Sequence, residues 1–156
     1  DEEIPETADT IEGNAILKAE HVRHRYGYDC FADDTGLEVE ALNGEPGVLS
    51  ARYAGDDKND DSNVTKLLKN LDGKENRNAQ FKTAIALNLN DNQNLFTGIC
   101  KGKIIKEKRG DQGFGYDPIF VPEGFKETFA EMSLSEKSEI SHRGIAFKEL
   151  IAYLSK

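Results

Sequence analysis

The hydrophobic positions change their spacing several times along this chain, and each spacing predicts an element. Between residues 9 and 27, apolar residues recur every three or four positions, which predicts an amphipathic helix capped by Asp9 and ended by Gly27. Two later stretches repeat this spacing and predict further helices, with the apolar sets Val64, Leu67, Leu68 and Leu71, and Phe147, Leu150, Ile151 and Leu154.

In other stretches, apolar and polar residues alternate with a period of two, which predicts strands. A short strand over residues 28–32 leads into an acidic segment, and residues 37–41 then alternate like a half-buried strand. Residues 81–89 and 95–105 alternate on either side of a polar turn, which predicts a β-hairpin. A brief strand follows at 119–121. The mixture of helices and strands predicts an α/β fold.

Length and charge narrow the class of protein. The chain has 156 residues, 37% of them hydrophobic, which is enough for one compact domain. Lys and Arg number 20 against 29 Asp and Glu, a net charge of -9 that argues against binding to nucleic acid or anionic membranes. We expect a soluble protein without a membrane span, which binds an anionic substrate only through a local basic pocket or a bridging cation.

The most distinctive stretch is Phe31–Leu37, which carries the adjacent carboxylates Asp33 and Asp34. Thr35 and Gly36 follow at once, so we expect the acidic pair to lie on a turn. Adjacent side chains on an extended backbone point to opposite faces, so one carboxylate could face a cleft and a metal ion while the other braces the turn. A solvated turn without function remains the alternative.

Three other stretches carry candidate chemistry. Small residues surround Arg52, a composition that lets a backbone approach an anionic ligand. The glycine-rich segment 109–118 holds two aromatic residues, which either stack on a flat ligand or pack within the loop. Lys137, His142 and Arg143 gather at the start of the terminal helix, where positive charge opposes the helix dipole unless an anion or an acceptor-rich ligand binds there.

Five short motifs then occur in one order along the chain. They are Asn14-Ala15 with Lys18, Ala32 to Leu37, Ser50-Ala51-Arg52-Tyr53, Phe114 to Pro118, and Glu136-Lys137-Ser138 through Ser141-His142-Arg143-Gly144. Together they resemble the inosine triphosphate pyrophosphatase family, which hydrolyses ITP, dITP and XTP to the monophosphate and pyrophosphate. The resemblance implies an α/β domain with a long twisted mixed sheet flanked by helices, and two lobes with an active-site cleft between them.

The resemblance also implies roles for individual residues. Asp34 matches the catalytic proton acceptor and a metal contact, and Glu6 matches a second Mg²⁺ ligand. Lys18, Thr35 and Arg52 match substrate contacts, with the two cations on phosphate. The implied pocket for the base comprises Phe114, Gly115, Tyr116, Asp117, Lys137, His142 and Arg143.

One part of the family pattern has no counterpart here. The family's first strand and its phosphate-binding loop are not found before Asp1, so we expect one pyrophosphatase domain over residues 1–156 that is incomplete at its N-terminus. The resemblance further implies a cytoplasmic homodimer acting on a nucleoside triphosphate. Two alternatives stay open: a related pyrophosphatase for other modified nucleotides, including modified pyrimidines, and a nucleotide-binding module without turnover.

Overall fold

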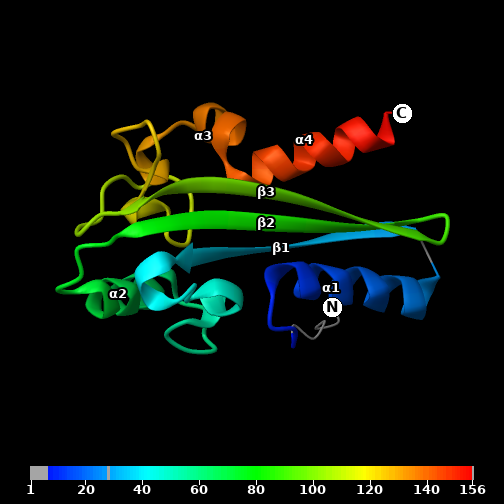
Figure 1. The fold of residues 1–156 in the computed structure, drawn as a ribbon, viewed down its shortest axis with the longest axis horizontal. Coiled ribbons are helices and arrows are strands. Elements are labelled where there is room, and N and C mark those ends of the chain that lie inside the picture. Colours follow the sequence, from blue (N-terminus) through cyan, green and yellow to red (C-terminus); the bar gives the residue numbers. More distant parts are fainter. Residues whose placement is uncertain (1–6, 28, 156) are drawn as a thin grey trace.

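A computed structural model describes residues 7–27 and 29–155, and a four-stranded antiparallel sheet forms its centre (Figure 1). The strands lie in sequence order and are β1 Cys30–Val39, β2 Asn78–Leu89, β3 Asn92–Ile104 and β4 Phe120–Pro122. The fold is therefore α/β as expected, but the sheet in the described residues is antiparallel and not mixed. Neighbouring strands follow one another in the chain and each reverses direction, which produces this pattern.

The predicted hairpin is confirmed as β2 and β3. Its turn lies at Asn90 and Asp91, whose φ angles are 51° and 65°. These left-handed angles suit a tight hairpin turn, and Asn and Asp tolerate them better than most residues. The turn is therefore shorter than the segment between the two predicted strands, 81–89 and 95–105, because β3 already begins at Asn92.

The first predicted helix is confirmed as α1, Ile11–Tyr26. Its N-cap is Thr10 and not Asp9, because the Thr10 hydroxyl accepts a hydrogen bond from the Gly13 amide at 2.9 Å. Gly27 ends the helix with a φ of 71°, the left-handed conformation that glycine adopts without a steric penalty.

Two helices cover opposite faces of the sheet. The α1 helix packs Ala15 and Ala19 against Ala84 and Ala86 of β2. The terminal helix α4, His142–Leu154, packs Ala146 and Leu150 against Ile85 and Leu87 of the same strand. Because successive strand residues point to opposite faces, these two sets place α1 and α4 on opposite sides, as Figure 1 shows.

The main core lies at the other end of the sheet. There α2, Asp60–Leu71, contributes Val64, Leu67 and Leu71, as its predicted apolar spacing requires, and Asn59 caps the helix. The remaining helix is α3, Leu134–Ile140, and short 3-10 helices span Glu40–Leu42, Gly47–Arg52, Asp117–Ile119 and Phe129–Glu131. Within the described part of the chain, no helix has the length and apolar character needed to cross a membrane.

Candidate functional site

Strand β1 carries both aspartates in its interior. The segment expected to turn at Asp33 and Asp34 is instead continuous strand, because these residues pair with Ile85 and Ala84 of β2. Gly36 has a different purpose from the expected one: a Cβ there would meet the Gly47 carbonyl and the Ile11 side chain. Glycine at this position therefore allows close packing and does not end the strand.

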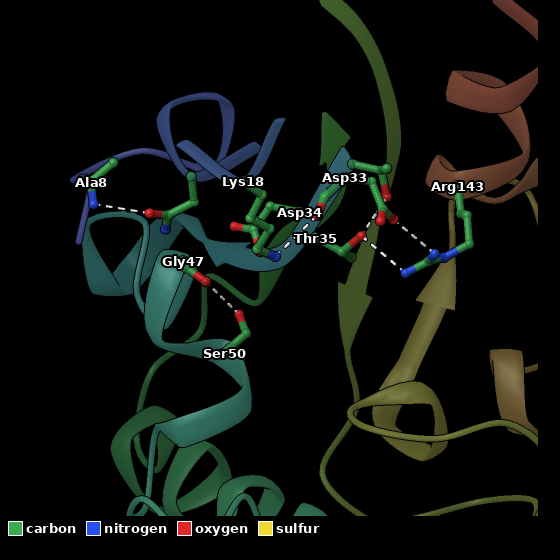
Figure 2. A network of polar contacts seen from close by, with 10 residues as sticks. Ala8, Lys18, Asp33, Asp34, Thr35, Gly47, Ser50 and Arg143 are labelled. Atoms are coloured by element: carbon green, nitrogen blue, oxygen red, sulfur yellow. Dashed lines mark hydrogen bonds and ion pairs between the residues drawn. The ribbon is translucent and has the colours of Figure 1, made fainter. Parts of the chain in front are cut away.

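On the face of β1 toward α1, Asp34 pairs with Lys18. The Lys18 Nζ donates to Asp34 Oδ1 at 3.0 Å and to the Asp33 backbone oxygen at 3.0 Å (Figure 2). Asp34 is buried, and the Lys18 side chain is only 19% exposed. The site thus holds a carboxylate and an ammonium group in a charge-assisted hydrogen bond.

On the opposite face, Asp33 and Thr35 contact Arg143 at the start of α4. Arg143 Nη1 donates to Asp33 Oδ2 at 2.9 Å, and Nη2 donates to Thr35 Oγ1 at 3.3 Å (Figure 2). The Thr35 hydroxyl also shares a hydrogen bond of 2.8 Å with Thr83 of β2. Asp33 of β1 and Arg143 of α4, which are 110 positions apart in the chain, are thereby joined.

The N-terminus of α4 reaches this point because β3 has a glycine beneath it. A Cβ on Gly98 would overlap the His142 carbonyl and the Ala146 amide. Gly98 pairs with Thr83, which in turn pairs with Thr35, so a row of small residues crosses the sheet under the helix end. This row sets how closely His142 approaches the sheet.

His142 is buried against aromatic rings. Its imidazole stacks on Phe81 with ring centres 4.6 Å apart. Burial, reinforced by the nearby cations Lys137 and Arg143, lowers the pKa of His142 from 6.5 to about 3, so the ring is neutral at pH 7. Its Nδ1 has no hydrogen-bond partner among the described residues, and a buried polar atom without a partner is costly unless a ligand or water supplies one.

The glycine-rich loop folds around the Asp117 carboxylate. Asp117 Oδ2 accepts hydrogen bonds from the Phe114 amide at 3.1 Å and from Lys137 Nζ at 2.6 Å. A Cβ on Gly113, whose φ is 75°, would overlap this carboxylate, so the loop can close around it only with glycine there. The Lys137 ammonium also lies 4.9 Å from the centre of the Phe114 ring, which is 68% exposed.

These groups surround a cavity of about 450 Å³. It is lined by the predicted base-pocket residues and by Thr35, that is, by Thr35, Phe114, Gly115, Tyr116, Asp117, Lys137, His142 and Arg143. Lys18 and Asp34 lie on the other face of β1, and Arg52 ends the Gly47–Arg52 helix outside the lining. Glu6 lies outside the described residues. A larger hollow, of about 1310 Å³ over the other end of the sheet, contains none of the predicted site residues in its lining.

Asp34 has the chemistry of a Mg²⁺ ligand, although it does not form a complete site by itself. Among residues 7–27 and 29–155, no three His, Cys, Asp or Glu side chains come together as a metal site. Mg²⁺ in phosphate-processing sites needs only one or two protein carboxylates, because phosphate oxygens and water complete its octahedron. The donor set on this face therefore fits a cation that is held jointly with a substrate.

Several residues at the site were not predicted from sequence. Thr83 lies in the predicted hairpin without a predicted role, and the pairing of Asp33 with Arg143 is not expected from the sequence. Helix α3, which carries Lys137, was also missed, although Ser133 and Glu136 have the spacing of a capping box, and the structure shows both of its hydrogen bonds. The capping box could have been found in the sequence, whereas the other contacts depend on strand register.

An α/β domain with a cavity of about 450 Å³, aromatic and cationic groups in the cavity lining, and a carboxylate–ammonium pair nearby has the features of a protein that binds a small molecule. The profile of the Ham1 family matches residues 1–153, and the chain belongs to this family.

Named relatives agree with this assignment. The dITP/XTP pyrophosphatase of Christiangramia forsetii is 67% identical over 155 residues, which cover 99% of this chain and 82% of that protein. The Flavobacterium psychrophilum dITP/XTP pyrophosphatase is 68% identical over 152 residues, which cover 97% of this chain and 80% of that protein. The structure of the Staphylococcus aureus Ham1 protein superposes with a TM-score of 0.96 at 45% identity, covering 99% of this chain and 81% of that one.

Proposed function

We infer that this protein is a hydrolase that converts dITP and XTP to their monophosphates and pyrophosphate, as the names of its close relatives state for those proteins. ITP is included as the ribose counterpart of dITP. The observation that carries the inference is a convergence in space. Residues from the glycine-rich loop, α3 and α4 that the family resemblance assigns to the base line one cavity, together with Thr35 of β1, which the resemblance gives as a substrate contact.

We propose that this cavity selects the base. The exposed Phe114 ring offers a stacking face, and the Arg143 guanidinium offers donors at the cavity wall. Hypoxanthine and xanthine carry an acceptor oxygen at C6, where adenine carries an amino donor. A donor-lined wall satisfies the first two bases and opposes adenine, and such a mismatch leaves buried polar groups unpaired.

The triphosphate is assigned to the other face of β1. Asp34 accepts the proton of the water that attacks the α-phosphorus, and pyrophosphate leaves. Lys18 already donates to Asp34, so it can hold this carboxylate in place and contact phosphate oxygens. Arg52 is proposed as a second phosphate contact. Ham1 pyrophosphatases typically use a divalent metal. We propose Mg²⁺ with Asp34 and Glu6 as ligands, which would neutralise phosphate charge when bound.

Three further proposals concern the whole molecule. The base cavity and the phosphate face lie on two sides of one strand, which is consistent with an active site between two lobes. The family resemblance supports a homodimer, which sedimentation or size-exclusion chromatography with light scattering tests. Because the substrates belong to the nucleotide pool, we propose that the enzyme acts in the cytoplasm.

A nucleotide panel tests the activity. The protein is incubated with ITP, dITP, XTP, GTP, ATP and a modified pyrimidine triphosphate, each with and without Mg²⁺, and released pyrophosphate and orthophosphate are measured separately. We expect pyrophosphate from ITP, dITP and XTP, only with the metal present. Binding of these nucleotides without product would instead indicate a binding module, and orthophosphate alone would indicate a different hydrolase.

A further inference from the structure

Thr83 on β2 has a buried hydroxyl beside the cavity. Its residue is 0% exposed, and it lies directly opposite Thr35 in the strand pairing, with 2.8 Å between the two Oγ1 atoms. Among the described residues, Thr35 is the hydrogen-bond partner that the structure gives Thr83. Thr35 differs from Thr83 in that it is only partly buried and lines the cavity.

One of the two possible donors in this hydrogen bond is favoured over the other. A threonine hydroxyl has one proton to donate and two lone pairs to accept with. If Thr35 donated to Thr83, the Thr83 proton would be buried without an acceptor, which is costly. If Thr83 donates to Thr35, the Thr83 proton is satisfied. The second arrangement is therefore favoured.

Arg143 donates to the second lone pair of the Thr35 hydroxyl oxygen. Its Nη2 donates to Thr35 Oγ1 at 3.3 Å, and a guanidinium can only donate. Thr35 then accepts from both Thr83 and Arg143, so its lone pairs are occupied. Its own proton remains available for an acceptor in the cavity.

We propose that Thr83 is a positioning residue for nucleotide recognition, which makes the Thr35 hydroxyl a hydrogen-bond donor toward an acceptor atom of the bound nucleotide. The proposal rests on the proposed function, because it requires a nucleotide in this cavity. Thr83 itself does not touch the substrate. It acts through Thr35 by setting the direction of one proton before the substrate arrives, which is a form of preorganisation.

Four variants separate this role from a purely structural one. Thr83→Val keeps the size and branching of the side chain but removes the hydroxyl, and Thr83→Ser keeps the hydroxyl. Thr35→Val removes the proposed donor, and the double variant removes both. Thr97→Val on β3 is the matched control, because this residue pairs with Ala84 and lies on the other face of the sheet. Each variant is measured for kcat and KM with ITP and for its melting temperature.

The expected result is a loss that depends on Thr35. Thr83→Val should lower kcat/KM for ITP about three- to tenfold, mainly through KM, without lowering the melting temperature, and Thr83→Ser should restore it. Thr35→Val should cost more than Thr83→Val. Adding Thr83→Val to Thr35→Val should cost nothing further in kcat/KM, and should raise the melting temperature because it removes the stranded buried hydroxyl.

Two outcomes would overturn the proposal. One is equal kinetics for Thr83→Val, Thr97→Val and the unaltered protein. The other is additive losses in the double variant, which would show that Thr83 acts independently of Thr35. Either result would leave the proposed function intact if the unaltered protein still releases pyrophosphate from ITP. If the unaltered protein releases none, the proposed function fails first.

Discussion

Asp33 and Asp34 are neighbours in the chain, yet their carboxylates make contacts on opposite faces of β1. Asp34 accepts from Lys18 of α1, and Asp33 accepts from Arg143 of α4. Because the backbone between them is extended, one strand serves both the phosphate side and the base side of the proposed site. Substitutions of Asp33 and Asp34 should therefore have different effects on the kinetics.

We expect Asp34→Asn to abolish ITP turnover while the protein still folds. The change removes a charge and a base but almost no volume, and the remaining amide oxygen can still accept from Lys18. Measured kcat should fall by at least about a hundredfold, in line with the usual contribution of a general base. Thermal melting provides the check on folding.

Asp33→Asn is the matched comparison on the same strand. It weakens the contact with Arg143 at the base side, so it should raise KM for ITP and change kcat much less. If Asp33→Asn abolished turnover and Asp34→Asn kept most of it, the catalytic role would belong to Asp33, and the assignment of the two faces would be reversed.

Arg143→Ala should erode discrimination between bases. Losing a donor to a buried acceptor costs about 1–3 kcal/mol, so kcat/KM for ITP should fall by roughly 5- to 150-fold. The value for ATP should fall much less, because adenine does not offer the acceptor. Steady-state kinetics with both nucleotides measure this. An equal fall for the two would assign Arg143 to phosphate binding or to structure.

Gly98→Ala should displace the start of α4, which carries Arg143, from strand β3. The added methyl group meets the His142 carbonyl, so the start of α4 must move away from β3 and carry Arg143 away from Thr35. Overpacking of this kind typically costs about 1–3 kcal/mol in stability, and we expect KM for ITP to rise as well. Melting curves and kinetics measure the two effects.

A second destabilised variant separates these effects. Leu68→Ala on α2 removes a partly buried contact with the main core, and Leu68 is not part of the cavity lining. At a temperature where both variants are folded, only Gly98→Ala should show the raised KM. A similar KM for both would mean that general destabilisation explains the result.

The low pKa of His142 predicts an acid-sensitive fold. The folded protein keeps this ring neutral down to a pKa of about 3, whereas the unfolded chain takes up a proton near the ordinary value of 6.5. Stability from this residue is therefore fully present above pH 6.5 and is lost as the pH falls toward 3. One proton contributes a slope of at most about 1.4 kcal/mol per pH unit.

Urea unfolding between pH 4.5 and 6.5 measures this slope. His142→Gln should have a shallower pH dependence of its unfolding free energy than the unaltered protein. His24→Gln is the control, because His24 is exposed on α1. If both variants kept the original slope, His142 would not be the group that links stability to pH.

Local patterns determined the elements and most of the candidate residues. Apolar periodicity located α1, α2, α4 and the β2–β3 hairpin, because burial of one face imposes the same spacing wherever such an element forms. Short motifs in a fixed order were enough to identify the family. The base-pocket residues came from that resemblance, and they line one cavity in the structure.

Only the tertiary structure determined which contacts the residues of β1 make on each face of the strand. The sequence around Asp33 and Asp34 is compatible both with a turn and with a strand that pairs with a neighbour. Gly36 indicates a turn in the sequence, whereas in the structure glycine is needed there because the Gly47 carbonyl lies too close for a Cβ. The contact of Thr35 with Thr83 depends on the register of two strands that lie far apart in the chain. Register and helix approach are set by long-range packing, which no local pattern encodes.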